Sequence, residues 1–502
     1  MSLCNGRRAS LWPLIAIAIS GTACTLREPL SAGQSANYWH YSLGYRPHDL
    51  LIGYQQALTP AKRAHFRNLA GVLVVEPILS DSERWILPEG IDPLAAAKRI
   101  NTLPGLRYAQ PNYRRRLQAY AASEFDPGQE AKNNPLWHLK LLDLNRTWAS
   151  DKPANLPRFS GDYPPGKGIM VAVVDSGVDV KHPDLSGNIA RNAEGKYLFL
   201  DEIKACGQSD VLAGAGGQTL VYDWVTAYDN PQGTGPDGNG HGTHVAGIIA
   251  AIGNNIPGLA CQSPPCNTVG TAPGVTILPV KTMDAQGDGD DYCIARGLRD
   301  AADAGARIIN LSVGGPDPGP MLAEVIVYLA QKGVVLVVAS GNDGLRVNYP
   351  AAYPGAIAVG AIGNPNDALF PDALNKGLPY SSRGPQLALV APGGSDTEMC
   401  PEKRCGIYST VPTYSTFISL HGKVTGTVYG RLTGTSMATP QVTGVAAMIL
   451  AREPQLTPEQ VRERILASTS PVSGTDGTFS ERYGYGLLNP YRALTLVSHD
   501  GK

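Results

Sequence analysis

From about residue 168 onward, apolar runs that suit buried strands alternate with segments in which apolar residues recur at helical spacing. The strand-like runs, rich in Val and Ile, are GIMVAVVDSGV, VTILPVKTM, ARIINLSVGG, GVVLVVASGN and AIAVGAIG. Helical spacing appears between them in HGTHVAGIIAAI, DYCIARGLRDAADAG and PMLAEVIVYLAQKG. Continuous Val/Ile runs indicate strands buried on both faces, so the alternation predicts a parallel α/β sheet. Functional side chains of such a sheet are expected on loops beyond the carboxyl ends of its strands.

A different pattern occupies residues 47–117. Strands are predicted in DLLIGY, VLVVEPIL, RWILPEG and LRYAQPNYRRRL, and helices in TPAKRAHFRNLAG and DPLAAAKRINTLPG. Asp92 is the expected cap of the second helix, with Pro93 at its first position. The order β-α-β-β-α-β is that of a ferredoxin-like α+β domain. We expect this small domain to precede an α/β domain over residues 135–497, with linkers over 24–46 and 118–134.

Residues 1–23 have the pattern of an export signal. Arg7 and Arg8 precede the apolar run LWPLIAIAIS, which is too short to span a membrane as a mature helix. Two alternatives remain: ordinary cleavage after Ala23, or a lipobox in SGTAC with a lipid on Cys24, although Gly21 stands where leucine is usual. We expect a periplasmic, cell-surface or secreted protein whose only membrane attachment would be that lipid.

Composition indicates a globular protein. Of 502 residues, 43% are hydrophobic and 17% charged, and the formal net charge is −1. This balance gives no reason to expect nucleic acid or an anionic membrane as a partner. We expect a monomer.

The cysteines also favour export. After Cys4 and Cys24, six cysteines remain, an even number that suits disulfides. The loops CQSPPC and CPEKRC suggest local pairs, which would leave one pair by elimination, although the connectivity stays open. A metal site is the weaker alternative, because neither loop has zinc-ribbon spacing. The candidate pairs are Cys261–Cys266, Cys400–Cys405 and Cys206–Cys293.

Four polar residues at strand and helix ends are candidates for catalysis. Asp175 follows a predicted strand, Asn342 follows another, His241 opens a helix in GHGTHVAG, and Ser436 opens a helix in GTSMATP. Each has a structural alternative: a turn cap for Asp175, a turn former for Asn342 and a helix cap for Ser436. His241 and His244 have i,i+3 spacing, but the glutamate of a zinc motif is missing, so His244 is expected to be a packed helix residue.

The motifs VVDSGVDVKHPDL, GHGTHVAG, NLSVGG, ASGN and GTSMATP, with the closing YGYGLLN, together resemble the subtilisin family (subtilases) of serine proteases over about 135–495. The segment 47–117, with YAQPNY, resembles that family's inhibitory pro-segment; an ordinary binding module is the alternative. The resemblance implies a doubly wound, mostly parallel sheet with helices on both faces. It implies a serine endopeptidase made as an autoprocessed zymogen cleaved within 118–134. Asp175, His241 and Ser436 would be the triad, and Asn342 the oxyanion donor.

The resemblance also implies where a substrate strand binds. Ser312, Val313 and Gly314 would form one edge, and Gly287, Asp288 and Gly289 the other, with Gly341 also lining the site; the glycines could instead mark turns. Protein or peptide substrates and the chain's own pro-segment are the expected partners. Asp288, Asp290 and Asp291 form an acidic cluster near the second edge, which suggests a mild preference for basic residues before the scissile bond; a solvated acidic loop or a calcium site is the alternative.

The resemblance implies no cofactor for the chemistry, and it allows structural calcium without assigning residues to it. Two other functions stay open: a tripeptidyl-type exopeptidase, whose cleft would be blocked by an insertion, and an inactive binding protein on the same fold. The segment before Ser436, from CPEKRC onward, is expected to shape the primed side of the cleft.

Overall fold

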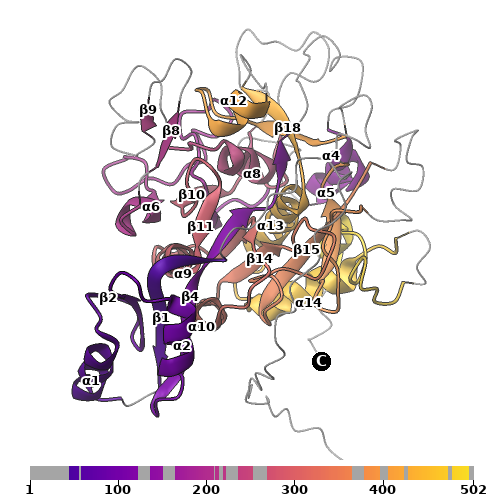
Figure 1. Ribbon diagram of the computed structural model, residues 1–502. Helices are drawn as coiled ribbons and strands as arrows, with labels where there is room; N and C mark the ends of the chain where they lie inside the picture. Colours follow the sequence, from indigo (N-terminus) through magenta and orange to yellow (C-terminus); the bar gives the residue numbers. More distant parts are fainter. Residues whose placement is uncertain are drawn as a thin grey trace, which may run out of the picture. The chain divides into compact units, whose positions relative to one another are not determined.

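The computed structural model places the predicted strands and helices in an α/β arrangement with a further small sheet (Figure 1). The predicted signal segment, Cys24 and most of both predicted linkers lie outside the described residues, and residues from 43 onward belong to one compact unit. The structure describes residues 44–55, 58–121, 136–150, 164–208, 210–213, 219–221, 236–252, 268–364, 378–395, 405–422, 428–472 and 477–496.

The central sheet has seven strands in the order β16-β15-β14-β12-β6-β10-β7, and every neighbouring pair is parallel. The short β7 and β16 were not predicted, because two to four residues carry little periodicity. The bounds are β6 Met170–Asp175, β7 Leu200–Asp201, β10 Thr276–Lys281, β12 Ile308–Leu311, β14 Val335–Ala339, β15 Ala356–Ile362 and β16 Leu389–Pro392.

Helices cover both faces of this sheet. Val171 and Val173 of β6 belong to the same buried cluster as α8 (His241–Ala250) and α13 (Thr435–Arg452). Ala172 and Val174 belong to the opposite cluster, with α9 (Asp291–Asp303) and α10 (Pro320–Gln331). Successive strand residues point to opposite faces, so β6 is buried on both sides. The predicted α/β class, with a parallel sheet between two helical layers, is confirmed.

Smaller elements surround these layers. The helices are α4 Trp137–Leu141, α5 Leu144–Ser150, α6 Glu202–Ala205, α12 Phe417–Gly422, α14 Pro458–Ser468 and α15 Pro490–Thr495. The strands are β8 Val211–Ala213, β9 Thr219–Val221, β17 Ile407–Thr410 and β18 Tyr429–Thr433.

The N-terminal elements follow in the order β-α-β-β-α-β around a core of their own, and the antiparallel strand order is β4-β1-β3-β2. Side-chain oxygens of Thr59 and Asp92 cap the two helices, as their sequences predict. The elements are β1 Tyr45–Tyr54, α1 Pro60–Ala70, β2 Val74–Leu79, β3 Ser82–Ile86, α2 Pro93–Ile100 and β4 Leu106–Leu117.

Strand β4 continues beyond this small sheet into the α/β part of the chain. Its end pairs antiparallel with β11 (Asp288–Asp290) and with β13 (Val313–Gly314) (Figure 1). The next strand, β5 (Tyr120–Ala121), pairs antiparallel with β18. Residues 114–117, before residues 118 and 119, and residues 120–121, after them, are therefore all in hydrogen-bonded strand pairs.

Cys206 and Cys293 form a disulfide with a Cα–Cα distance of 6.0 Å, linking the end of α6 to the first turn of α9. Cys405 is also disulfide-bonded, whereas Cys261, Cys266 and Cys400 lie outside the described residues. In the part of the chain that the structure describes, no helix combines the length and the apolar character needed to cross a bilayer.

Candidate active site

The candidate catalytic residues come from adjacent strand ends and two helix starts. Asp175 is the last residue of β6, Ser312 follows β12, and Asn342 lies three residues after β14. Because β14, β12 and β6 are neighbours and parallel, these residues share one edge of the sheet. His241 is the first residue of α8, and Ser436 the second of α13, a helix that packs against α8.

Asp175 and His241 form a buried pair. The Nδ1–H of His241 donates to Asp175 Oδ1 at 2.7 Å, and both side chains are at most 1% exposed. The same carboxylate oxygen accepts from the Ser176 backbone N–H at 2.8 Å. These bonds fix the imidazole tautomer and leave Nε2 as the nitrogen that can accept a proton.

Asp237 holds the start of α8 and was not predicted. Its Oδ1 accepts from Ser176 Oγ and the Gly240 N–H, each at 2.8 Å. Its Oδ2 accepts from Thr243 N at 2.8 Å and from Thr243 Oγ1 at 2.6 Å. Burial raises the pKa of this carboxyl, while the hydrogen bonds from Thr243 oppose the rise. Its position four residues before His241 in DGNGH was the available signal, since an aspartate before a helix often caps it.

His244 is a packed residue, as expected. Its Nε2–H donates to the carbonyl oxygens of Ile407 at 3.0 Å and Gly430 at 3.3 Å. Burial, with a smaller contribution from the neighbouring His241, lowers its pKa to about 3, so the ring stays neutral. No group of three or more His, Cys, Asp or Glu side chains among the described residues could hold a metal ion, so no residue is assigned to calcium.

Ser436 is not used as a helix cap. Helix α13 has Gly434 at its cap position and no side-chain capping bond. The Ser436 hydroxyl donates to the Ser312 carbonyl oxygen at 3.0 Å. Within the described part of the chain, His241 Nε2 has no hydrogen-bond partner, so the serine–histidine contact is not formed here. Such catalytic contacts commonly tighten only when substrate reacts.

A peptide group of the chain itself lies at Ser436. The Ser436 backbone N–H donates to the Gln118 carbonyl oxygen at 3.1 Å, and the Gln118 N–H donates to the Ser312 carbonyl oxygen at 3.1 Å. Gly434 has a φ of 150°, and a Cβ there would overlap the Gln118 carbonyl oxygen. Glycine is therefore required for a peptide to approach this helix start.

The side-chain amide of Asn342 also lies beside Gly434, and its hydrogen bonds fix which way the amide is turned. Its Oδ1 accepts from the Thr435 N–H and from Thr435 Oγ1, each at 2.9 Å, so Nδ2 is the donor on the other side. A Cβ on Gly434 would lie 2.8 Å from this Nδ2 and would also touch the Gln118 oxygen. Gly341, the other predicted residue of this loop, donates its N–H to Thr435 Oγ1 at 3.3 Å.

The two predicted substrate edges are the strands that hold the end of β4. Val313 pairs with Leu117 and Gly314 with Arg116 on one side; Asp288 pairs with Arg116 and Gly289 with Arg115 on the other. The Leu117 N–H donates to the Gly287 carbonyl oxygen at 3.2 Å. After residues 118 and 119, Leu432 and Thr433 of β18 pair with Ala121 and Tyr120, so the segment before Ser436 pairs with the chain that follows Ala119.

Each aspartate of the acidic edge contacts an arginine of the N-terminal sheet. Arg116 Nε lies 2.7 Å from Asp288, and Arg46 Nε lies 2.9 Å from Asp290. Arg115 binds Asp291 through two nitrogens. Asp290 and Asp291 are buried, so this edge is not a solvated acidic loop. None of Gln118, Leu117 and Arg115 was singled out from the sequence, because their importance comes from contacts with residues about 170 to 320 positions away.

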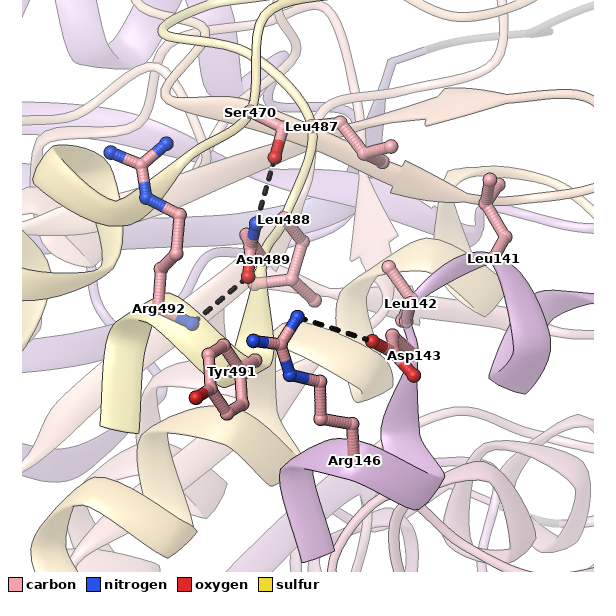
Figure 2. A pocket seen from close by; sticks show the side chains of 10 residues that line it. All are labelled: Leu141, Leu142, Asp143, Arg146, Ser470, Leu487, Leu488, Asn489, Tyr491 and Arg492. Atoms are coloured by element: carbon pink, nitrogen blue, oxygen red, sulfur yellow. Dashed lines mark hydrogen bonds and ion pairs between the residues drawn. The ribbon is translucent and has the colours of Figure 1, made fainter. Parts of the chain in front are cut away.

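A separate pocket of about 320 Å³ lies between the α4–α5 segment and the start of α15. Figure 2 shows that its polar side chains contact one another: Arg146 lies 4.0 Å from Asp143, and Asn489 donates to Ser470 Oγ at 2.8 Å. None of the candidate catalytic residues lines this pocket, so we do not assign the chemistry to it.

Comparison with known proteins decides the family. The model of the subtilase family, peptidase S8, matches residues 166–486, which is more than half of the chain and includes Asp175, His241, Asn342 and Ser436. The chain belongs to the subtilase family. It is a serine protease, and its α/β fold is subtilisin-like.

Similar subtilases support this assignment. The chain is 34% identical to Subtilisin of Bacillus pumilus over 329 residues, covering 64% of this chain and 90% of that protein. It is 34% identical to Thermitase of Thermoactinomyces vulgaris over 334 residues, covering 66% and 91%. A solved structure, fervidolysin of Fervidobacterium pennivorans, described as a keratinolytic enzyme related to subtilisin, superimposes with a TM-score of 0.62 at 25% identity. That comparison covers 90% of this subtilase and 61% of fervidolysin.

Proposed function

We propose that this chain is the zymogen of an exported serine endopeptidase. Asp175, His241 and Ser436 would be its triad, with Asn342 and the Ser436 N–H forming the oxyanion hole. The observation that carries the proposal is the 3.1 Å contact between the Ser436 N–H and the carbonyl oxygen of Gln118. A peptide carbonyl held on this donor is what acyl transfer at a serine requires.

In the proposed first half of the reaction, Ser436 Oγ attacks the carbonyl carbon of a peptide bond. Its proton passes to His241 Nε2, and Asp175 stabilises the imidazolium through the 2.7 Å bond to Nδ1. The negative charge on the carbonyl oxygen is stabilised by the Ser436 N–H and the Asn342 amide. The carbon–nitrogen bond then breaks, and the leaving amine takes the proton from His241.

The second half repeats these steps with water. Water attacks the ester between Ser436 and the acyl group, and His241 removes the water proton. When the ester bond breaks, His241 returns a proton to Ser436 Oγ, which restores the free enzyme and releases a carboxylic acid.

We further propose that the first bond cleaved is the one between Gln118 and Ala119, and that residues 47–117 form an inhibitory pro-segment. The support is the path of the chain, because Gln118 bonds to Ser312 and Ser436, whereas residues 120–121 already pair with the opposite strand β18. Until this bond is cut, β4 occupies the cleft that a substrate would enter.

Strand pairing favours an endopeptidase over a tripeptidyl exopeptidase. A tripeptidyl cleft would end three residues before the scissile bond. Here Arg115 and Arg114, the fourth and fifth residues before Ala119, still pair with Gly289 and Asp290. The cleft therefore accommodates a chain that continues beyond three residues.

Export is supported by the disulfide between Cys206 and Cys293, since such bonds persist in oxidising compartments. The signal over residues 1–23, the two alternatives at Cys24 and the monomeric state remain predictions.

Self-cleavage of the precursor tests the proposed zymogen and its scissile bond. We expect the wild-type chain, purified from a protease-free host, to yield a protein with Ala119 at its N-terminus, measured by intact mass and N-terminal sequencing. The Ser436→Ala variant should remain uncleaved. Ser186→Ala, which removes the hydroxyl of a half-buried loop serine, is the matched control and should mature normally.

Labelling with a fluorophosphonate provides an independent readout of the nucleophile. We expect the mature enzyme to be labelled at Ser436, located by peptide mass. Normal maturation of Ser436→Ala would contradict self-cleavage, and a mature enzyme that is not labelled would indicate the inactive binding protein instead.

A further inference from the structure

Arg115 of β4 is completely buried in the α/β part of the chain. Its Nε donates to Asp291 Oδ1 at 2.6 Å and its Nη2 to Asp291 Oδ2 at 3.0 Å, while its Nη1 donates to the Asp317 carbonyl oxygen at 2.8 Å. Both side chains of the ion pair are 0% exposed. This is a bidentate charge-assisted pair, the geometry for which arginine is best suited.

The groups that accept from this guanidinium belong to the peptidase, while the N-terminal sheet adds Gln110, which donates to Asp291, and the ring of Tyr113, 5.9 Å from Arg115 Cζ. Asp291 is the first residue of α9, whose first turn the disulfide at Cys293 holds to the end of α6. Asp317 and the glycines 315 and 319 lie between β13 and α10. The pocket would therefore remain when residues up to 118 leave.

Two glycines provide the space for the guanidinium. A Cβ on Gly315 would lie 2.9 Å from Arg115 Nη1, and one on Gly319 would lie 3.3 Å from Arg115 Nη2 and closer still to Asp291. A side chain at either position would occupy the space of the guanidinium or of its carboxylate partner. The pocket is shaped for a planar cation.

Counted back from the proposed scissile bond, Arg115 is the fourth residue. When the pro-segment leaves, Asp291 loses both nitrogens of Arg115 and also Gln110 Nε2, which donates to its Oδ2 at 3.2 Å. When a substrate covers Asp291 again, a carboxylate without partners is unfavourable, and a substrate arginine at the same place would supply two of the three donors. An aliphatic side chain such as leucine would supply none.

We propose that Asp291 is a specificity-determining residue that makes the mature enzyme select arginine four residues before the scissile bond. The proposal rests on the proposed function and concerns which peptides the same site prefers. It narrows the expected preference for basic residues to one position. The neighbouring pair Arg116–Asp288 has side chains that are 26% and 27% exposed, so solvent screening makes the third position much less selective.

The test compares peptides that differ at one residue. The autoprocessed enzyme is assayed with acetyl-Xaa-Ala-Leu-Gln-aminomethylcoumarin, in which Xaa is Arg, Lys, citrulline or Leu. We expect kcat/KM for Arg to exceed that for Leu by about 10²-fold, because the site's buried polar group is left unpaired with Leu. Lysine, a point charge without the planar fork, and neutral citrulline should fall between them.

Two variants test whether Asp291 is the source of the selectivity for arginine. In Asp291→Asn the ratio of kcat/KM for Arg over Leu should fall to within about threefold of 1, whereas the matched control Asp288→Asn should keep the wild-type ratio. If Asp291→Asn fails to mature, the kcat/KM values of the wild-type enzyme for the peptide series still test the selectivity. Equal kcat/KM for Arg and Leu in an active wild-type enzyme overturns the selectivity and leaves the protease function intact. An enzyme that cleaves none of the peptides and takes no fluorophosphonate overturns both.

Discussion

At the scale of single residues, the site depends on which atom of each side chain is already engaged. Asn342 uses its oxygen to hold Thr435, so its nitrogen is the atom left to donate beside Gly434. His241 uses Nδ1 for Asp175, so Nε2 is the nitrogen left to exchange protons. Neither orientation can be read from the residue types, because an amide and an imidazole can each be used in two ways.

Replacing Asn342 with aspartate separates these two roles. Asn342→Asp keeps an acceptor for Thr435 but removes the donor and places a negative charge beside the developing oxyanion. We expect kcat on a Gln-containing peptide to fall by roughly 10²–10³-fold, with KM and the thermal unfolding midpoint little changed. A kcat within twofold of wild type would show that Asn342 does not contribute to the oxyanion hole.

At the scale of elements, the starts of α8 and α13 are held without capping side chains of their own. Helix α8 is held by Asp237, whose carboxylate accepts from Gly240 and from both donors of Thr243. At the start of α13, the Thr435 N–H donates to Asn342 Oδ1, and the next N–H, that of Ser436, donates to the Gln118 carbonyl oxygen. A helix start without a cap of its own has N–H groups available for a ligand.

Asp237 is therefore predicted to act on stability and, through His241, on catalysis. Asp237→Asn replaces an acceptor oxygen with a donor inside a set of four donors, so the free energy of unfolding should fall by about 2–4 kcal/mol. The measurement is denaturant unfolding in the Ser436→Ala background, which prevents autolysis. Asp303→Asn, at an exposed ion pair with Lys332, is the control and should change the free energy of unfolding by less than about 0.5 kcal/mol.

The Cys206–Cys293 disulfide joins two elements 87 residues apart in the chain. Replacing both cysteines with serine removes this constraint on the unfolded chain, and we expect the free energy of unfolding to fall by about 2–4 kcal/mol. Denaturant unfolding in the same Ser436→Ala background checks this, with the reduced parent protein as a comparison. An unchanged unfolding free energy would show that packing alone holds α6 against α9.

At the scale of the whole molecule, two buried histidines link folding to pH. Burial lowers the pKa of both His138 and His244 from about 6.5 to about 3. Between these values the unfolded chain binds more protons than the folded chain, so stability present above pH 6.5 is lost as pH falls toward 3. Each histidine contributes a slope of up to about 1.4 kcal/mol per pH unit in this window.

Substitution of His244 tests whether this histidine is a source of the pH dependence of stability. Between pH 6.5 and 5, the Ser436→Ala precursor should lose less of its free energy of unfolding when it also carries His244→Gln, since glutamine can still donate to Ile407. Burial also lowers the pKa of His182 and raises the pKa of Asp284 and of Asp291 to about 6, so these groups contribute to the slope in both proteins. His65→Gln, on an exposed position of α1, should leave the slope as it was. An unchanged slope in His244→Gln would rule out this histidine as a source.

Much of the fold followed from the sequence because its signals are local. The apolar runs predicted β6, β10, β12, β14 and β15, and Thr59 and Asp92 marked two helix starts. Short strands such as β7 carried no such signal. The motifs also identified Asp175, His241, Asn342 and Ser436, because a family resemblance preserves residue types at strand and helix ends.

The sequence by itself therefore determined the fold class, the family and the residues that the proposed chemistry would use. Only the tertiary structure decided what lies against them: Gln118 on the Ser436 N–H, Arg115 on Asp291, and Asp237 on the hydroxyl of Ser176, the residue after Asp175. These contacts join residues between 61 and about 320 positions apart. Periodicity and motifs record local preference, whereas strand pairing and burial bring distant segments together and so decide which bond and which side chain the site holds.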